Sequence, residues 1–162
     1  MPYPPGPALA IALDNLRSAH NVGAILRTAD AVAVHQIFLY GITPTPENHK
    51  VEKTSLSAEF AIPWSHYPNG PLHLQSVKSH FQIWALEGGQ PSVSLFQKKV
   101  PKDERTILLI MGSEVAGIDP LLLELADHRF YIPMLGFKRS LNVASAFSIA
   151  AYTIRFSLQQ RE

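Results

Sequence analysis

Short apolar runs alternate along this chain with segments of helical periodicity, and this alternation constrains its fold more than any other feature. The runs at 8–13, 36–40, 81–86 and 106–111 are apolar along almost their whole length. Strands of this kind are buried on both faces, which is typical of a parallel sheet covered by helices on both sides. The sequence therefore predicts an α/β fold with a mostly parallel sheet.

The remaining segments complete the alternation. Helices are expected at 21–34, 71–79, 119–126 and 141–158, and further strands at 60–65 and 128–132. The first of these helices places apolar residues at the three- and four-residue spacing of one helix face. Asp119 and Pro120 are typical of a helix start, because Asp caps free N–H groups and Pro suits the first helical position.

The 162 residues are enough for one domain with a substantial core and too few for two ordinary domains. Residues 1–7, four of them proline, are expected to form an extended leader before a single domain at 8–162. This leader lacks the basic start and apolar core of a signal peptide, and no apolar run is long enough to span a bilayer. We therefore expect no membrane association.

Composition excludes several classes of site. The 14 Lys and Arg nearly balance the 13 Asp and Glu, which excludes a polybasic arm and an acidic tail. The absence of Cys excludes disulfides, thiol catalysis and Cys-ligated metal sites, and it fits the cytoplasmic location that we expect. Only His73 and His80 share a plausible helix, and their spacing is wrong for a metal site, so no metal is expected. Dinucleotide-binding, P-loop and nucleophile-elbow motifs are absent.

Glycine-bearing loops follow three of the predicted strands. They lie at 87–89, 112–117 and 133–136. In parallel α/β sheets, ligands bind outside the carboxyl ends of the strands, and glycine allows the backbone to approach a ligand closely. The sequence therefore predicts a ligand pocket formed by these three loops.

The last expected helix has no charged residue from Val143 to Ile154, and small or apolar side chains surround nearly its whole circumference. A helix on the surface of a monomer would show a polar stripe, so this one is expected to be buried on most sides. A homodimer interface explains this burial, since two-fold dimers are the commonest oligomers. The alternative is a central helix in a monomer.

Three sequence blocks carry most of the functional information. They are N-V-G-A-I-L-R-T-A at 21–29, G-S-E-V-A-G-I at 112–118, and I-P-M at 132–134 followed by S-L-N-V-A-S-A at 140–146. In their residues, order and spacing they resemble the motifs of the SpoU/TrmH branch of the SPOUT superfamily, the RNA ribose 2′-O-methyltransferases. The resemblance covers nearly the whole chain, and it departs from many members at 18–20, where they have an Asp-Pro-Gly or similar turn.

This resemblance implies a deep trefoil knot at the C-terminal end of the domain and an S-adenosylmethionine (AdoMet) site in the knot loops. These loops correspond to 86–89, 112–117 and 132–142, the glycine-bearing segments described above. The residues implied to bind the cofactor are Leu86, Glu87, Gly88, Gly112, Gly117, Ile132, Met134, Leu141 and Asn142. The resemblance accounts for nearly the whole chain and implies only the catalytic unit of the family. We therefore expect a bare catalytic core without an appended RNA-binding domain.

The resemblance also implies a catalytic set, in which Arg27 activates the ribose 2′-hydroxyl. A guanidinium can orient an RNA phosphate and favour alkoxide character through its positive charge. The other implied members are Asn21, Glu114, Ser140 and Asn142. Simpler roles stay open: Arg27 is solvated or pairs with Asp30, Asn21 and Ser140 are helix N-caps, and Glu114 is a solvated loop carboxylate.

RNA contacts are expected from Arg27, Lys138 and Arg139. A diffuse basic surface is added by Arg17, His49, Lys50 and Lys53, although the net charge is only +1. The sequence thus predicts an AdoMet-dependent 2′-O-ribose methyltransferase that acts on tRNA or rRNA as a homodimer. The alternatives are a catalytically inactive RNA-binding protein on the same fold and an α/β enzyme that uses another nucleotide.

Overall fold

A parallel sheet forms the centre of the fold. The computed structural model describes residues 8–89, 91–97, 100 and 103–160. Within these residues seven strands pair in the order β3-β2-β1-β6-β4-β7-β5, and every pairing between them is parallel. The strands are β1 Leu9–Asp14, β2 Gln36–Tyr40, β3 Trp64–Tyr67, β4 Phe81–Leu86, β5 Val93–Ser94, β6 Thr106–Gly112 and β7 His128–Tyr131. The predicted mostly parallel α/β sheet is confirmed, whereas the expected leader at 1–7 lies outside the described residues.

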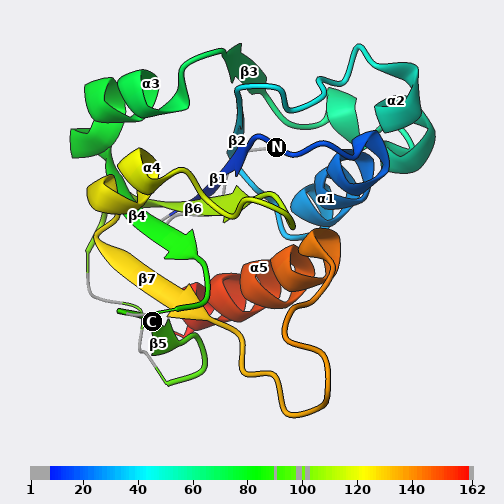
Figure 1. Cartoon of the computed structure of the whole chain (residues 1–162). Helices are drawn as coiled ribbons and strands as arrows, with labels where there is room; N and C mark the ends of the chain where they lie inside the picture. The colour runs from blue at the N-terminus through cyan, green and yellow to red at the C-terminus, as the bar shows by residue number, and fades with distance from the viewer. Residues whose placement is uncertain (1–7, 90, 98–99, 101–102, 161–162) are drawn as a thin grey trace.

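Helices cover both faces of this sheet, as predicted (Figure 1). They are α1 Ala19–Ala31, α2 His49–Ser55, α3 Gly70–Val77, α4 Pro120–Leu125 and α5 Val143–Gln159, with short 3-10 turns at Ala58–Phe60 and Lys78–His80. The helices α1, α2 and α5 pack on one face, and α3 and α4 pack on the other. Within the described part of the chain, no helix has both the length and the hydropathy needed to cross a membrane.

The apolar runs behave as two-sided strands. In β1, the side chains of Leu9, Ile11 and Leu13 join the core under α1 and α5, while Ala10 and Ala12 join the core under α3 and α4. All six residues of β1 are buried. Because successive strand side chains point to opposite faces, a strand buried on both faces has to be apolar throughout.

The structure corrects two of the expected elements and adds one helix that was not predicted. α1 begins at Ala19 rather than at 21, because the Ser18 hydroxyl caps it by accepting a hydrogen bond from the Asn21 N–H at 3.2 Å. The strand expected at 60–65 begins only at Trp64, since Phe60 lies in a 3-10 turn and is 82% exposed. Sequence periodicity gave no sign of α2, because that seven-residue helix buries only Val51 and Ser55.

The strand order at one edge of the sheet places the predicted loops together. β4 lies between β6 and β7, so the carboxyl ends of these three strands are adjacent. β7 in turn lies between β4 and β5, although β5 directly follows β4 in the chain. The segments that leave β4, β6 and β7 therefore meet at one edge, where parallel sheets bind their ligands.

α5 is buried on one side only. Phe147, Ala150 and Ile154 are buried against the sheet and α1, whereas Ile149, Tyr152 and Phe156 are exposed. The expected burial on most sides is therefore not reached within one chain, and α5 is not a central helix. Phe156, with 54% of its surface exposed, stacks on Tyr152 and leaves an apolar face uncovered.

Arg155 joins α5 to the end of α1 through its buried guanidinium. Its Nε donates to the Val32 carbonyl at 2.7 Å and its Nη2 donates to the Ala33 carbonyl at 2.6 Å. Arg155→Met removes both charge-assisted hydrogen bonds, and we expect it to lower the free energy of unfolding by about 3 kcal/mol. Urea denaturation at one fixed protein concentration measures this, with Thr153→Ala on the same helix as the control. Equal midpoints for the two variants would contradict the assignment.

Candidate active site

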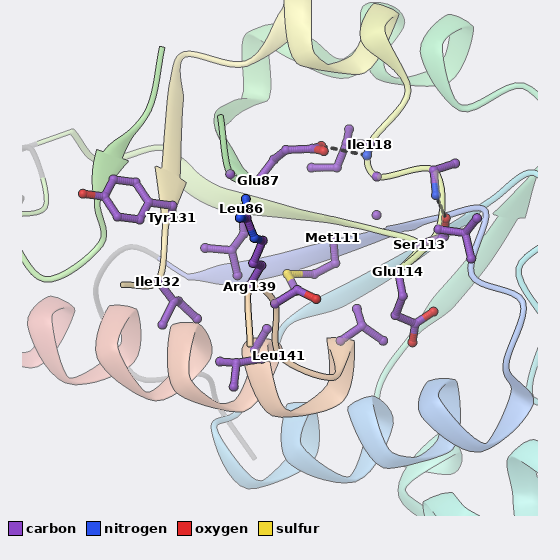
Figure 2. A pocket seen from close by; sticks show the side chains of 18 of the residues that line it. Leu86, Glu87, Met111, Ser113, Glu114, Ile118, Tyr131, Ile132, Arg139 and Leu141 are labelled. Atoms are coloured by element: carbon purple, nitrogen blue, oxygen red, sulfur yellow. Dashed lines mark hydrogen bonds between the residues drawn. The ribbon is translucent and has the colours of Figure 1, made fainter. Parts of the chain in front are cut away.

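A pocket of about 390 Å³ opens where the loops after β4, β6 and β7 meet the start of α5 (Figure 2). A volume of this size is typical of small-molecule sites. Its walls are formed by Leu86, Glu87 and Gly88 after β4, by Met111 to Ile118 around the end of β6, and by Tyr131, Ile132, Met134, Arg139, Ser140, Leu141, Val143 and Ala146. Apart from Asn142, every residue predicted to bind the cofactor lines this pocket.

The wall after β6 is a tight turn built on glycine. The Gly117 N–H donates to the Ser113 carbonyl at 2.9 Å, and the Ala116 N–H donates to the Ser113 hydroxyl at 3.0 Å. A Cβ added at Gly112 would lie 2.3 Å from the carbonyl carbon of Gly117, so the turn leaves no room for a side chain there. The pocket is therefore bordered here by backbone, as the glycine-bearing loops predicted.

Glu87 holds this turn against the end of β4. Its Oε2 accepts a hydrogen bond from the Ile118 N–H at 2.7 Å (Figure 2). Burial raises the pKa of the Glu87 carboxyl, and this effect outweighs the opposing hydrogen bond from Ile118 and the nearby positive charge of Arg129. A partly buried carboxyl thus sits in the wall of the pocket.

The raised pKa of Glu87 predicts a pH-dependent stability difference. In the unfolded chain Glu87 ionises at its ordinary pKa, whereas the folded protein keeps the proton to higher pH, so the wild type loses stability as pH rises through the folded pKa. Glu87→Gln cannot titrate. Its free energy of unfolding, relative to wild type, is therefore expected to rise between about pH 4 and about pH 7. Urea denaturation across this range measures the difference, and a constant or falling difference contradicts the prediction.

A chain of three polar side chains links α1, the β6 turn and the start of α5. Asn21 Nδ2 donates to Glu114 Oε1 at 2.6 Å, and Asn142 Nδ2 donates to Asn21 Oδ1 at 3.1 Å. Figure 2 shows the Glu114 side chain pointing from its turn toward the neighbouring helices. These residues come from three of the predicted motifs, and the fold brings them together although Asn21 and Asn142 are far apart in sequence.

The N-cap roles considered from the sequence for Asn21 and Ser140 are wrong. Asn21 is not the N-cap of α1, because Ser18 occupies that position and leaves the Asn21 amide free to contact Glu114. Ser140 is not the N-cap of α5, because Asn142 Oδ1 accepts from the N–H groups of Ala144 at 2.9 Å and Ser145 at 3.3 Å. Ser140 lines the pocket instead.

The three residues expected to contact RNA lie in different places. Figure 2 shows Arg139 extending into the pocket, whereas Lys138 is exposed and does not line it. Arg27 is exposed on α1 and lies outside the pocket of its own chain. Within the described residues it forms no ion pair, so the pairing with Asp30 is absent. Also within these residues, no group of three or more His, Asp or Glu side chains is placed to hold a metal ion.

Several pocket residues were not predicted from the sequence. Met111 and Tyr131 are the last or next-to-last residues of their strands, and Val143 and Ala146 lie on the first turn of α5. Val143 and Ala146 lie inside the third motif, and Met111 and Tyr131 lie directly next to a motif, which was the available signal. Apolar residues at such positions contribute equally to a core, so residue type alone did not identify them.

Comparison with known proteins decides the family. The profile of the SpoU rRNA Methylase family matches residues 8–152. The chain belongs to the SpoU rRNA methylase family. The resemblance found in the three motifs is thereby confirmed, and the pocket described above lies within the matched region of this family member.

Individual members of the SpoU family match this chain over most of its length. It is 32% identical over 158 residues to the 23S rRNA (guanosine-2′-O-)-methyltransferase RlmB of Bordetella pertussis, covering 97% of this chain and 62% of RlmB. It is 31% identical over 156 residues to the tRNA (guanosine(18)-2′-O)-methyltransferase of Aquifex aeolicus, covering 95% of this chain and 70% of that enzyme. An AdoMet-bound rRNA methyltransferase from Sinorhizobium meliloti superposes with a TM-score of 0.86 at 29% identity, over 96% of this chain and 58% of that one. The chain therefore spans about three fifths of the length of RlmB.

Proposed function

We propose that this SpoU protein is an AdoMet-dependent methyltransferase that modifies the 2′-hydroxyl of a ribose in tRNA or rRNA. The observation that carries the proposal is the polar chain of Asn21, Glu114 and Asn142 beside a pocket formed by the three motif loops. The relatives named for rRNA and tRNA 2′-O-methylation support the same reaction.

The pocket fits AdoMet in size and chemistry. Apolar side chains of Leu86, Ile132 and Leu141 suit an adenine ring, and the glycine-rich backbone at 112–117 allows polar groups of a ligand to approach closely. Bound AdoMet supplies an electrophilic methyl group on a sulfonium sulfur, and the neutral thioether that departs is a good leaving group. The work left to the protein is to position the ribose oxygen and to favour loss of the hydroxyl proton, which gives this oxygen alkoxide character for the attack.

The residues of the chain divide this work. We assign Asn142 and Ser140 to the mouth of the pocket, where they orient the target ribose, with Asn21 and Glu114 holding Asn142 in place. Arg27 supplies the positive charge beside the 2′-oxygen. We assign Arg139, which lines the pocket, and the exposed Lys138 to contacts with RNA phosphates.

We also propose a homodimer in which Arg27 acts at the pocket of the partner. Its exposed position outside its own pocket and the uncovered apolar face of α5 both support this arrangement.

The trefoil knot belongs to the proposal as well. In the sheet, β7 lies between β4 and β5, although these two strands follow each other in the chain. This order supports the knot, because β7 comes later in the chain and has to insert next to the connection that joins β4 to β5. The expected cytoplasmic location stays a prediction.

Two measurements test the function. Mass spectrometry of total RNA from cells with and without the gene is expected to show one or more ribose methylations that depend on it. Calorimetry with the purified protein is expected to detect AdoMet binding. Binding of RNA without any binding of AdoMet would favour the catalytically inactive RNA-binding protein, and tight binding of NAD or ATP instead would favour another α/β enzyme.

A further inference from the structure

A second hollow lies between the start of α1 and α2, two helices that are neighbours on one side of the sheet (Figure 1). It is lined by Arg17, Ser18, Ala19, His20, Pro44, Asn48, Lys50, Lys53 and Thr54. Four of these side chains are basic or can become so, and none is acidic. Glu47 and Glu52, the acidic residues of the same segment, do not line it.

Close packing of the two helices shapes this hollow. A Cβ added at Gly23 of α1 would lie 1.7 Å from the Thr54 hydroxyl and 2.7 Å from the Val51 carbonyl oxygen, so only glycine allows this approach. α2 is thereby held against the first turns of α1, with Lys50 and Lys53 beside Arg17 and His20. The basic residues are gathered by the fold, since 30 or more residues separate the two groups in sequence.

Across the described residues, none of the four basic side chains that line the hollow, Arg17, His20, Lys50 and Lys53, forms an ion pair. The N-terminus of α1, a helix of 13 residues, adds its partial positive charge at the same place. A chain of net charge +1 thus concentrates three full positive charges around one hollow, which favours an anionic partner.

The hollow adjoins the candidate active site through α1. His20 lines the hollow, and the next residue, Asn21, contacts Glu114 and Asn142. In an RNA strand each ribose is flanked by phosphates on both sides. Because Asn142 contacts Asn21, which directly follows His20, a strand whose target ribose lies at Asn142 has the hollow beside it at the start of α1.

We propose that this hollow binds the phosphate backbone of the RNA strand next to the target nucleotide. Such contacts carry no base specificity; they set the register and orientation of the strand, so that the ribose reaches the pocket. The proposal deepens the proposed methyltransferase function, because it assigns a substrate-positioning surface outside the pocket that holds the cofactor.

The test compares the Lys50→Gln/Lys53→Gln double variant with Lys78→Gln, a matched control on an exposed turn after α3. The probe is a fluorescein-labelled single-stranded oligoribonucleotide, titrated at several salt concentrations. Loss of two phosphate contacts is expected to weaken binding about tenfold and to reduce the slope of log K against log salt by about 1.4. The KM for RNA is expected to rise by a similar factor, with kcat and AdoMet affinity unchanged. The control is expected to match wild type.

A second variant guards against loss of α2 in the first. Arg17 precedes α1, and Arg17→Gln is expected to weaken RNA binding as the double variant does. Unchanged affinity and salt slope in both variants would overturn the inference, as would an absence of RNA binding by wild type, and an acidic protein would then be the better candidate partner. Failure of the methyltransferase function has a different signature, in which wild type binds the oligoribonucleotide through these residues and transfers no methyl group.

Discussion

Replacing Arg27 with alanine is expected to lower kcat for RNA methyl transfer by about a hundred- to a thousandfold, with AdoMet affinity unchanged. A ribose hydroxyl is a weak nucleophile, and a fixed positive charge beside its oxygen favours the transition state. Arg27 is exposed, forms no ion pair within the described residues and lies on a helix where alanine is well tolerated, so the substitution should not disturb the fold.

Single-turnover assays with labelled AdoMet separate this effect from binding. Arg27→Lys is the informative companion, because it keeps the charge but loses the planar fork of the guanidinium, and an intermediate rate is expected. Transfer at the wild-type rate by Arg27→Ala would show that the assigned role is wrong.

Replacing Gly112 with alanine is expected to weaken AdoMet binding by about a hundredfold or more. The added Cβ would lie 2.3 Å from the carbonyl carbon of Gly117 and 2.4 Å from the Ile118 nitrogen. Both neighbours are backbone atoms, which cannot rotate away as a side chain can, so the turn that borders the pocket has to open. Calorimetry measures the loss of affinity.

Gly136→Ala is the control for this change. It lies in the loop between β7 and α5, and a Cβ added there would meet nothing within 4 Å, so wild-type affinity is expected. Equal affinities for the two variants would mean that the β6 turn does not shape the cofactor site.

The Arg27→Ala and Gly112→Ala variants together test whether Arg27 acts across a dimer. A mixed dimer of Arg27→Ala and Gly112→Ala chains has one intact pocket, on the Arg27→Ala chain, and one intact arginine, on the other. Activity returns on mixing only if the arginine serves the pocket of the partner. If it serves its own pocket, the mixture stays inactive.

Sequence periodicity predicted the sheet because its strands are buried on both faces, and a two-sided strand such as β1 has to be apolar throughout. It could not predict the position of β7 between β4 and β5, because strand order depends on how the connections cross and not on the strands themselves. α2 was missed since polar residues form most of it and Val51 is its only buried apolar residue.

The motifs located the candidate site, but for two of its residues local rules suggested an alternative role that the structure does not show. Asn21 and Ser140 both suit a helix N-cap, and in each case a nearby residue, Ser18 or Asn142, takes that position. The contact of Asn21 with Glu114 spans 93 residues of sequence, so no local pattern contains it. The same holds for the basic hollow, where the fold brings Arg17, Lys50 and Lys53 of the expected diffuse surface together with His20, whereas His49 does not line it.

Asn142 has two tasks at once: one end of its amide caps α5, and the other end is hydrogen-bonded to Asn21. The arrangement of the site therefore depends on the last helix being formed. A folding intermediate in which α5 has not yet docked lacks the contact between Asn142 and Asn21, so the polar chain of the site is completed only when α5 packs onto the rest of the domain.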